Sequence, residues 1–202
     1  MPENSSASKR IAPLKNLPQQ IRVNKQMMQA HSMLGTQTYS LHHPYKAGLL
    51  LLNNILGGNG MSSILNLQIR EKYGIAYTIE SNYSPLSDTG IFALYFGTDK
   101  EKVDRATALI FKEFKKIRST KMSEVQLQKA KNKFIGQIAL GEENRIGLII
   151  SMAKSLIDYQ KIDDLETVFN KIRAVSAEDM NAIANEVLDE KNLSSLTFHP
   201  IE

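Results

Sequence analysis

The sequence predicts an α+β domain in which helices pack on a mainly antiparallel sheet. Two stretches of alternating strand-favouring residues, 75–83 and 89–97, are joined by a short loop and therefore indicate an antiparallel pair. Segments of helical periodicity follow them, and several begin at capping sequences. With 202 residues and 42% hydrophobic content the chain can bury a substantial core, and we interpret it as one domain.

The N-terminal 24 residues differ in composition from the rest. They carry Ser, Pro and basic residues with little periodicity, so we expect a flexible lead-in or linker over 1–24 and the folded domain over 25–202. Residues 25–41 predict a strand with partly apolar residues on both faces, so both faces are expected to be covered. Residues 45–56 form a strongly apolar run, which predicts a helix buried on most sides.

Three glycines between residues 57 and 60 follow this helix. Glycine adopts positive φ without strain and lets another backbone approach closely, so we expect a helix stop and a flexible connection here. Ser62 or Ser63 can cap the next helix. Gly74 is expected to end that helix in the left-handed conformation.

The pattern changes from helical to alternating at Ile75. The strand that begins there carries four residues of one parity, which predicts a shared face for Ile75, Tyr77, Ile79 and Tyr83. Arg70 lies just before the change and Tyr77 just after it. A guanidinium and a phenol therefore flank a tight helix-to-strand corner, where they could converge on one ligand.

Capping sequences recur in the second half of the chain. Thr98 with Glu101 and Ser123 with Gln126 have capping-box spacing, so each pair predicts the start of a long helix. Three glycines interrupt the second helix, and a kink or break is expected near Gly141.

Shorter elements complete the chain. Asp163 with Glu166 and Ser176 with Asp179 predict the starts of two short helices. Residues 193–199 predict a closing strand.

The central motif resembles a known family. The run GG-x-G-MSS, followed by L-x-x-x-IREKYGIAY and DTGIFALYFGT, is similar to the C-terminal half-domain of the pitrilysin/insulinase family of zinc metallopeptidases, which includes the mitochondrial processing peptidase subunits. The resemblance covers roughly residues 26–188, and the order and spacing of the pieces make it specific. It implies the same α+β class. It also implies a non-catalytic domain that contributes substrate binding and transition-state contacts to a separate zinc-bearing half, on the same native chain or on another subunit.

The family pattern R-E-x-x-G-x-x-Y matches as Arg70, Glu71, Gly74 and Tyr77. In the family, the arginine and the tyrosine contact the substrate backbone near the scissile carbonyl. The resemblance therefore implies that Tyr77 is a catalytic oxyanion donor and that Arg70 and Tyr77 bind substrate. From chemistry alone, a surface salt bridge of Arg70 with Glu71 or Glu80, and an ordinary strand tyrosine at 77, deserve equal weight.

No zinc site is expected in this chain, and the resemblance assigns the zinc cofactor to the partner half. The family's H-x-x-E-H motif is absent, and the chain has no cysteine. His42 and His43 are sequence neighbours whose side chains diverge, while His31 and His199 lack a partner at helical spacing. The isolated chain is therefore expected to be inactive.

Charge and hydropathy exclude several other classes. The formal net charge of +4 is small for this length, so nucleic acid is not an expected partner. No apolar run approaches the roughly 20 residues of a membrane span, and no signal peptide is recognisable, so we expect a soluble chain. The sequence assigns it to no particular cellular compartment. The expected partners are a zinc-bearing half and a peptide substrate, with self-association as an option. The rival function is a structural or assembly subunit of the same fold.

Overall fold

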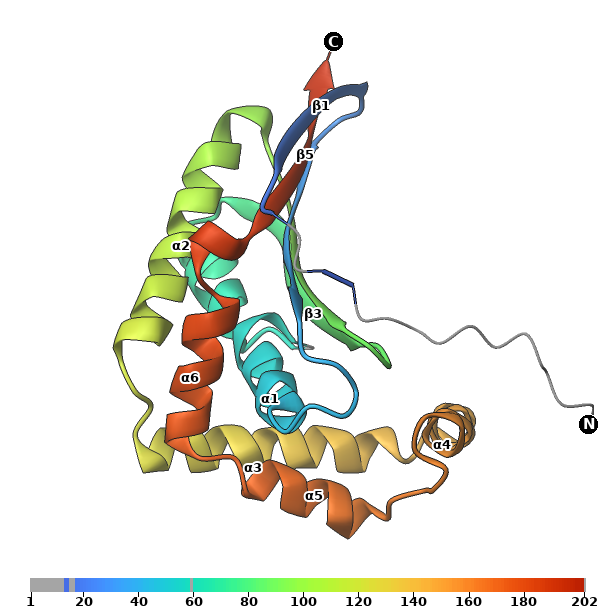
Figure 1. Ribbon diagram of the computed structural model, residues 1–202. Helices are drawn as coiled ribbons and strands as arrows, with labels where there is room; N and C mark the ends of the chain where they lie inside the picture. The colour runs from blue at the N-terminus through green and yellow to red at the C-terminus, as the bar shows by residue number, and fades with distance from the viewer. Residues whose placement is uncertain (1–12, 15–16, 59, 202) are drawn as a thin grey trace, which may run out of the picture.

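The computed structural model describes residues 13–14, 17–58 and 60–201. A five-stranded sheet with helices on one side forms an α+β domain (Figure 1). The strands are β1 Gln20–Gln26, β2 Ala30–Thr38, β3 Ala76–Pro85, β4 Gly90–Thr98 and β5 Ser194–Ile201. The α-helices are α1 Lys46–Gly57, α2 Val103–Ser119, α3 Glu124–Gly141, α4 Arg145–Tyr159, α5 Leu165–Arg173 and α6 Ala177–Val187. Three further short helices are η1 Asn66–Lys72, η2 Lys100–Lys102 and η3 Glu190–Asn192.

The sheet has the strand order β1-β5-β2-β4-β3. Only β1 and β5 pair in parallel, and every other neighbouring pair is antiparallel. This confirms the predicted α+β class with a mainly antiparallel sheet. The C-terminal strand β5 lies between β1 and β2, so the two ends of the described chain run side by side. Strand β3 forms one edge of the sheet.

The hydrophobic core lies between the sheet and the helices α1, α2 and α6, which Figure 1 shows on the same side of the sheet. Alternate residues of β2 and β4 point into it, as Leu34, Phe92 and Phe96 do, and β3 adds Ile79 and Tyr83. The apolar run of α1 supplies Leu49, Leu51, Leu52 and Leu56, each no more than 1% exposed. The predicted burial of this helix is confirmed.

The opposite face of the sheet is open. Met33 of β2 is 47% exposed and Ile91 of β4 is 50% exposed, because none of the helices in the described chain covers them. The expectation that both faces of the strand within 25–41 are covered is therefore wrong for the face that carries Met33. An apolar residue in a strand is compatible with burial, but only the packing of distant elements decides whether burial occurs.

The flexible lead-in expected over residues 1–24 is wrong for its last five residues. Residues 20–24 belong to β1, where Ile21 lies opposite Leu196 of β5. The backbone N–H of Ser195 also donates to the carbonyl of Gln19 at 2.7 Å. The order of this segment comes from a strand more than 170 positions away, which local composition does not show. The lead-in expected over residues 1–12 and 15–16 falls outside the described residues.

Local capping signals predicted several helix ends well. The capping boxes at Ser123 and Ser176 are both formed, each by reciprocal side-chain and backbone hydrogen bonds. The long helix is broken where expected, because α3 ends at Gly141 and α4 begins at Arg145. The cap of α5 is Asp164, one residue beyond the predicted Asp163; its carboxylate accepts from the N–H of Thr167 at 2.7 Å.

The capping box predicted at Thr98 is wrong. Thr98 is fully buried at the end of β4, and its hydroxyl donates to the carbonyl of Ile75 at 2.5 Å. The hydroxyl thereby ties β4 to the start of β3 and is not available to cap a helix. Helix α2 begins only at Val103, after the short turn η2.

Candidate functional site

The corner between η1 and β3 is built by an unusual helix and a glycine. Residues Asn66–Lys72 form a π-helix, a wider form than the α-helix expected from the sequence and one that is often found at functional sites. Gly74 has φ of 58°, and the next N–H, of Ile75, donates to the carbonyl of Ile69 at 3.3 Å. The left-handed end predicted at Gly74 is confirmed.

The serine predicted to cap this helix acts indirectly. The carbonyl of Ser63 accepts from the N–H of Leu67 at 3.0 Å, which is the hydrogen bond of a first helical turn. Its hydroxyl, however, accepts from the Asn66 side chain at 2.9 Å instead of capping a backbone N–H. The same Asn66 amide also donates to the carbonyl of Ile79 at 3.3 Å, so it links η1 to β3.

A β-bulge at the start of β3 sets the direction of Tyr77. Ala76 pairs with Thr98 and Thr78 with Gly97, so Tyr77 is an additional residue on its strand. Tyr77 is 51% exposed, whereas Ile79 is 3% exposed. The prediction that these two residues share a face is wrong, since the bulge interrupts the alternation. The phenol is directed to solvent at the corner.

Tyr77 belongs to a short charged network. Its hydroxyl donates to Oδ1 of Asp99 at 2.6 Å, and Oδ2 of Asp99 lies 2.7 Å from Nζ of Lys102. The hydrogen bond to Asp99 raises the pKa of Tyr77 above its usual value of 10.0. The hydrogen bonds from Lys102 and then Tyr77 lower the pKa of Asp99. At neutral pH the phenol therefore keeps its proton and Asp99 keeps its charge.

Sequence reasoning missed Asp99 and Lys102. Both lie between a strand and a helix, where an acidic residue followed by a lysine is common and carries no functional signal. Only the bulge brings the phenol to this carboxylate. The pairing of β3 with β4, which determines where the bulge occurs, cannot be read from a single strand's sequence.

Arg70 lies on the last turn of η1 and is exposed. Its Nε is 3.9 Å from Oε1 of Glu71, with 43% and 48% of the two side chains accessible. This confirms the first of the two alternative salt bridges, in a loose geometry that contributes about 0–1 kcal/mol at a surface. Within the described chain, no hydrogen bond or ion pair joins Arg70 to Tyr77. Both residues lie at the η1–β3 corner, but they contact different carboxylates: Arg70 that of Glu71, and Tyr77 that of Asp99.

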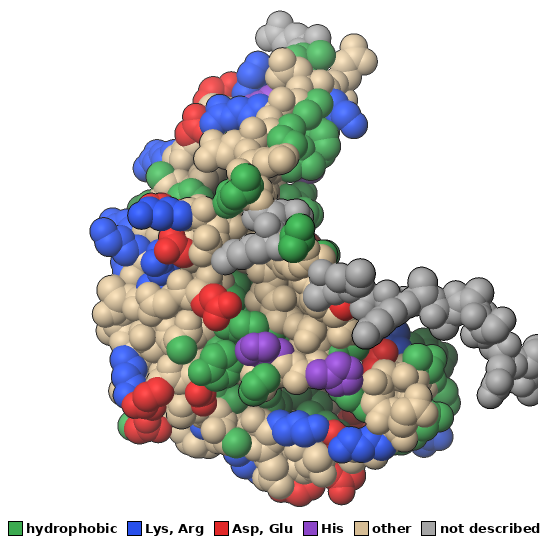
Figure 2. All heavy atoms as spheres, in the orientation of Figure 1, with side chains coloured by type: hydrophobic (Ala, Val, Ile, Leu, Met, Phe, Trp, Pro, Cys, Tyr) green, Lys and Arg blue, Asp and Glu red, His purple; other side chains and the backbone are tan. Residues whose placement is uncertain are grey.

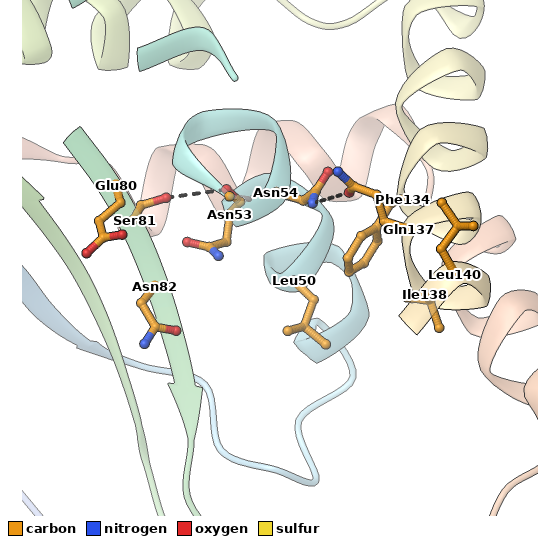
Figure 3. A pocket seen from close by; sticks show the side chains of 11 residues that line it. Leu50, Asn53, Asn54, Glu80, Ser81, Asn82, Phe134, Gln137, Ile138 and Leu140 are labelled. Carbon is orange, nitrogen blue, oxygen red and sulfur yellow. Dashed lines mark hydrogen bonds between the residues drawn. The ribbon is translucent and has the colours of Figure 1, made fainter. Parts of the chain in front are cut away.

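A pocket of about 720 Å³ lies between α1, α3 and the middle of β3 (Figure 3). Polar groups from α1 and β3 face apolar side chains of α3 across it. Asn54 donates to Oε1 of Gln137 at 2.7 Å, which links α1 to α3. A Cβ at Gly57, the last residue of α1, would lie 2.6 Å from the backbone N of Ser81. This glycine therefore permits the end of α1 to approach β3 closely. The flexible connection expected around residue 59 lies partly outside the described residues.

Three of the four histidines, His31, His42 and His43, take part in aromatic contacts. His43 stacks on Tyr39 with 4.1 Å between ring centroids, and His42 meets the edge of Tyr159. His31 Nδ1 lies 2.6 Å from the Tyr95 hydroxyl. Among residues 13–14, 17–58 and 60–201, no group of three or more His, Asp or Glu side chains is arranged to hold a metal. The described residues therefore offer no set of ligands that fits a zinc ion.

Helix α4 presents an exposed apolar stripe. It lies apart from the helices that cover the sheet, and hydrophobic side chains are visible around it in Figure 2. The stripe consists of Ile146, Ile149, Ile150, Leu156 and Ile157, which are 51–75% exposed. The helix is held to the body at its end, where Lys46 Nζ donates to the Tyr159 hydroxyl at 2.5 Å. Exposed apolar surface of this kind is typical of contact with a partner.

Basic and acidic side chains are interspersed on the face seen in Figure 2. None of the helices in the described part of the chain is long and apolar enough to cross a membrane.

Known proteins are similar to this chain in sequence and in fold. Residues 2–134 match the family described as the peptidase M16 inactive domain. An uncharacterized zinc protease of Bacillus subtilis, YmxG, is 28% identical over 166 residues, which are 82% of this chain and 40% of that protein. An uncharacterized zinc protease of Streptomyces coelicolor is 27% identical over 169 residues, covering 84% of this chain and 37% of that protein.

Solved structures agree on the fold. The crystal structure of a peptidase M16 inactive domain from Pseudomonas fluorescens superimposes with a TM-score of 0.85 at 21% identity, over 100% of this chain and 48% of that one. A protease from Helicobacter pylori gives a TM-score of 0.86 at 17% identity, over 99% of this chain and 48% of that one. The chain thus spans less than half the length of these relatives.

The family match covers the η1–β3 corner and most of the sheet. It confirms the resemblance to the non-zinc half-domain of the pitrilysin/insulinase peptidases, which M16 designates. The chain belongs to the family described as the peptidase M16 inactive domain, and the relatives that it matches in sequence are called zinc proteases.

Proposed function

We propose that this domain closes over a peptide bound to a zinc-bearing half and supplies substrate and transition-state contacts from the η1–β3 corner. We assign the zinc to the other half, because the relatives are called zinc proteases and the described residues here offer no ligand group. There the metal would act as a Lewis acid and activate water. The contribution of this chain is then binding, orientation and hydrogen-bond donation.

The observation that carries the proposal is the state of Tyr77. Its phenol is half exposed on a bulged strand, protonated, and held by a carboxylate that has a second partner in Lys102. A donor for a developing oxyanion must be available, fixed in place and still protonated at working pH. Tyr77 is exposed, protonated and held in place by Asp99, and it becomes available as a donor once its hydroxyl leaves Asp99.

The chemistry follows from amide hydrolysis, in which negative charge grows on the scissile carbonyl oxygen. We infer that the Tyr77 hydroxyl turns from Asp99 to that oxygen when substrate binds. Asp99 then keeps its ion pair with Lys102, so no buried or unpaired charge is left behind. Arg70, whose pair with Glu71 is loose, donates to a substrate backbone carbonyl and fixes the register of the peptide.

Two surfaces are available to the zinc-bearing half. One is the open face of the sheet, and the other is the apolar stripe of α4. Their exposure supports a domain that works against a partner, and it also permits self-association of the isolated chain.

The rival is an assembly subunit that keeps the fold but takes no part in hydrolysis. A chain of complex III2 from Candida albicans shares the fold, with a TM-score of 0.76 at 20% identity over 91% of this chain. The fold by itself therefore does not separate the two functions. Arg70 and Tyr77 favour the peptidase role, because an assembly subunit has no need of an exposed donor pair matching the family's R-E-x-x-G-x-x-Y pattern.

Reconstitution tests the proposal. The zinc-bearing half, produced separately, should cleave a quenched fluorescent peptide library only when this chain is added. This chain alone should show no turnover and should retain much less than one zinc ion after dialysis. If the zinc-bearing half reaches full activity alone, or if the pair forms a stable complex without cleaving any peptide, the assembly role replaces the proposal. A tightly bound zinc ion on this chain would contradict the assignment of the metal.

A further inference from the structure

A second polar pair lies on the open face of the sheet, on the two strands next to β3. His31 of β2 and Tyr95 of β4 are on neighbouring strands, and His31 Nδ1 lies 2.6 Å from the Tyr95 hydroxyl. Their rings are stacked, with 5.9 Å between centroids and 16° between planes. Both side chains are partly buried, so the imidazole is held in one orientation while part of it reaches solvent.

Gly97 connects this pair to the Tyr77 corner. It lies opposite His31 on β2 and opposite Thr78 on β3, so it occupies the middle of one row across the sheet. A Cβ there would approach the Tyr95 hydroxyl to 3.5 Å and His31 Nδ1 to 3.9 Å. Gly97 is itself buried, and Gln29 Oε1 would also lie 3.9 Å from a Cβ there, so the side chains of Gln29, His31 and Tyr95 surround this position. The register thus connects His31, through Gly97, to Thr78, the residue that follows Tyr77.

The spacing suits an extended peptide. Neighbouring strands are about 4.8 Å apart, so β2 and β3, with β4 between them, are about 10 Å apart. An extended peptide rises about 3.3 Å per residue, and about 10 Å corresponds to three residues. A peptide whose scissile carbonyl is at Tyr77 and which crosses the strands would reach His31 about three residues away.

The hydrogen bond decides which ring nitrogen carries the proton. A neutral imidazole has one N–H donor and one acceptor nitrogen. If the Tyr95 hydroxyl donates to Nδ1, the proton of the ring is on Nε2. Nε2 has no hydrogen-bond partner among the described residues and is not sealed inside the protein, so this N–H is open to a ligand.

We propose that His31 is a further substrate-binding residue, whose Nε2–H donates to a peptide backbone carbonyl about three residues from the scissile bond. Tyr95 is its positioning residue, because it fixes the tautomer that places the donor on the open face. This inference rests on the proposed function, since it takes the scissile carbonyl to lie at Tyr77. It adds a contact on the strand β2, away from the η1–β3 corner.

The tautomer can be measured on the 202-residue chain alone. Long-range ¹H–¹⁵N NMR spectra of the imidazoles should show His31 in the Nε2–H form. Tyr95→Phe should give a mixture of both forms, while the spectra of His42 and His43 stay unchanged. A wild-type His31 with its proton on Nδ1 would overturn the proposal.

Kinetics of the reconstituted enzyme test the contact itself. His31→Ala should raise KM about 3- to 10-fold and change kcat less than about 2-fold, as expected for the loss of one neutral hydrogen bond. His31→Gln retains an N–H donor at a similar reach and should restore KM to within about 2-fold of wild type. Lys129→Ala, at an exposed position on α3 outside the open face and the α4 stripe, is the control and should leave KM unchanged.

The results separate this inference from the proposed function. If Tyr77→Phe lowers kcat but His31→Ala leaves KM at the wild-type value, the contact at His31 is wrong and the function stands. If His31→Gln is as impaired as His31→Ala, the imidazole acts in packing and not as a donor, which also overturns the proposal. If Tyr77→Phe has no effect on kcat, the proposed function is contradicted, and the contact at His31 that rests on it is contradicted as well.

Discussion

The Tyr77 hydroxyl donates to Oδ1 of Asp99 at 2.6 Å, and the other oxygen of the same carboxylate is 2.7 Å from Nζ of Lys102. Asp99 thus has two partners of different kinds, one a phenol and one a cation. Loss of the phenol leaves the carboxylate with its ion pair. In the proposed function Tyr77 exchanges Asp99 for a substrate oxygen, and each part of this arrangement can be tested.

Asp99→Asn should lower the pKa of Tyr77 toward its ordinary value of 10.0, because the hydrogen bond to the carboxylate is the main cause of the raised pKa. The sign follows from linkage. A raised pKa in the folded state means that folding favours the protonated phenol. The resulting contribution to the free energy of unfolding is complete below about pH 10, and it is lost as the pH rises through the folded-state pKa. A ¹³C NMR titration of the Tyr77 ring measures the shift. Asp158→Asn, on α4, is the control, and an unchanged Tyr77 pKa in Asp99→Asn would disprove the coupling.

Two glycine substitutions should change stability in opposite directions. A Cβ at Gly90 would lie 2.0 Å from the carbonyl oxygen of Tyr39, which also accepts from the Tyr83 hydroxyl at 2.8 Å. Gly90→Ala should therefore destabilise the domain by about 2 kcal/mol or more. Gly136 lies within α3, and no neighbouring atom lies within 4 Å of the position that an added methyl group would take. Gly136→Ala should therefore stabilise the domain by about 0.5–1 kcal/mol.

Urea unfolding followed by circular dichroism measures both changes. Equal effects of the two substitutions would show that the close approach of Gly90 to Tyr39 is not tight in solution.

Much of the fold follows from local sequence. The capping boxes at Ser123 and Ser176 and the left-handed Gly74 depend on residues within one turn, and the sequence predicts each of them correctly. Strand β1 escapes prediction because its order depends on β5, at the other end of the chain. The prediction at Thr98 fails for a similar reason, since its hydroxyl binds the carbonyl of Ile75, next to another strand.

The candidate site is predictable only in part. The motif identifies Arg70 and Tyr77, and both are exposed at the expected corner. The direction predicted for Tyr77 is wrong because a bulge breaks the alternation of β3. Asp99 is not among the predicted site residues, because its contact with Tyr77 depends on the register between β3 and β4.

Arg70→Ala should raise KM of the reconstituted enzyme about 10-fold and leave kcat within about 2-fold, since the guanidinium is proposed to bind the ground state and the transition state equally. Stability should change by less than about 0.5 kcal/mol, because the pair with Glu71 is loose and exposed. Lys72→Ala removes a neighbouring cation and is the matched control. Steady-state kinetics with equal KM values for the two variants would remove Arg70 from the substrate site.

The central claim is that the Tyr77 hydroxyl stabilises the oxyanion. Tyr77→Phe removes one oxygen from an exposed side chain, so folding should be intact, as circular dichroism can verify. In the reconstituted enzyme its kcat should fall about 100-fold or somewhat more, the effect typical of a lost oxyanion donor. Tyr73→Phe removes a hydroxyl from the same corner and should keep the wild-type kcat. The decisive measurement is the ratio of these two kcat values: a ratio of about 100 is the expected result, and a ratio of about 1 would contradict the catalytic role of Tyr77.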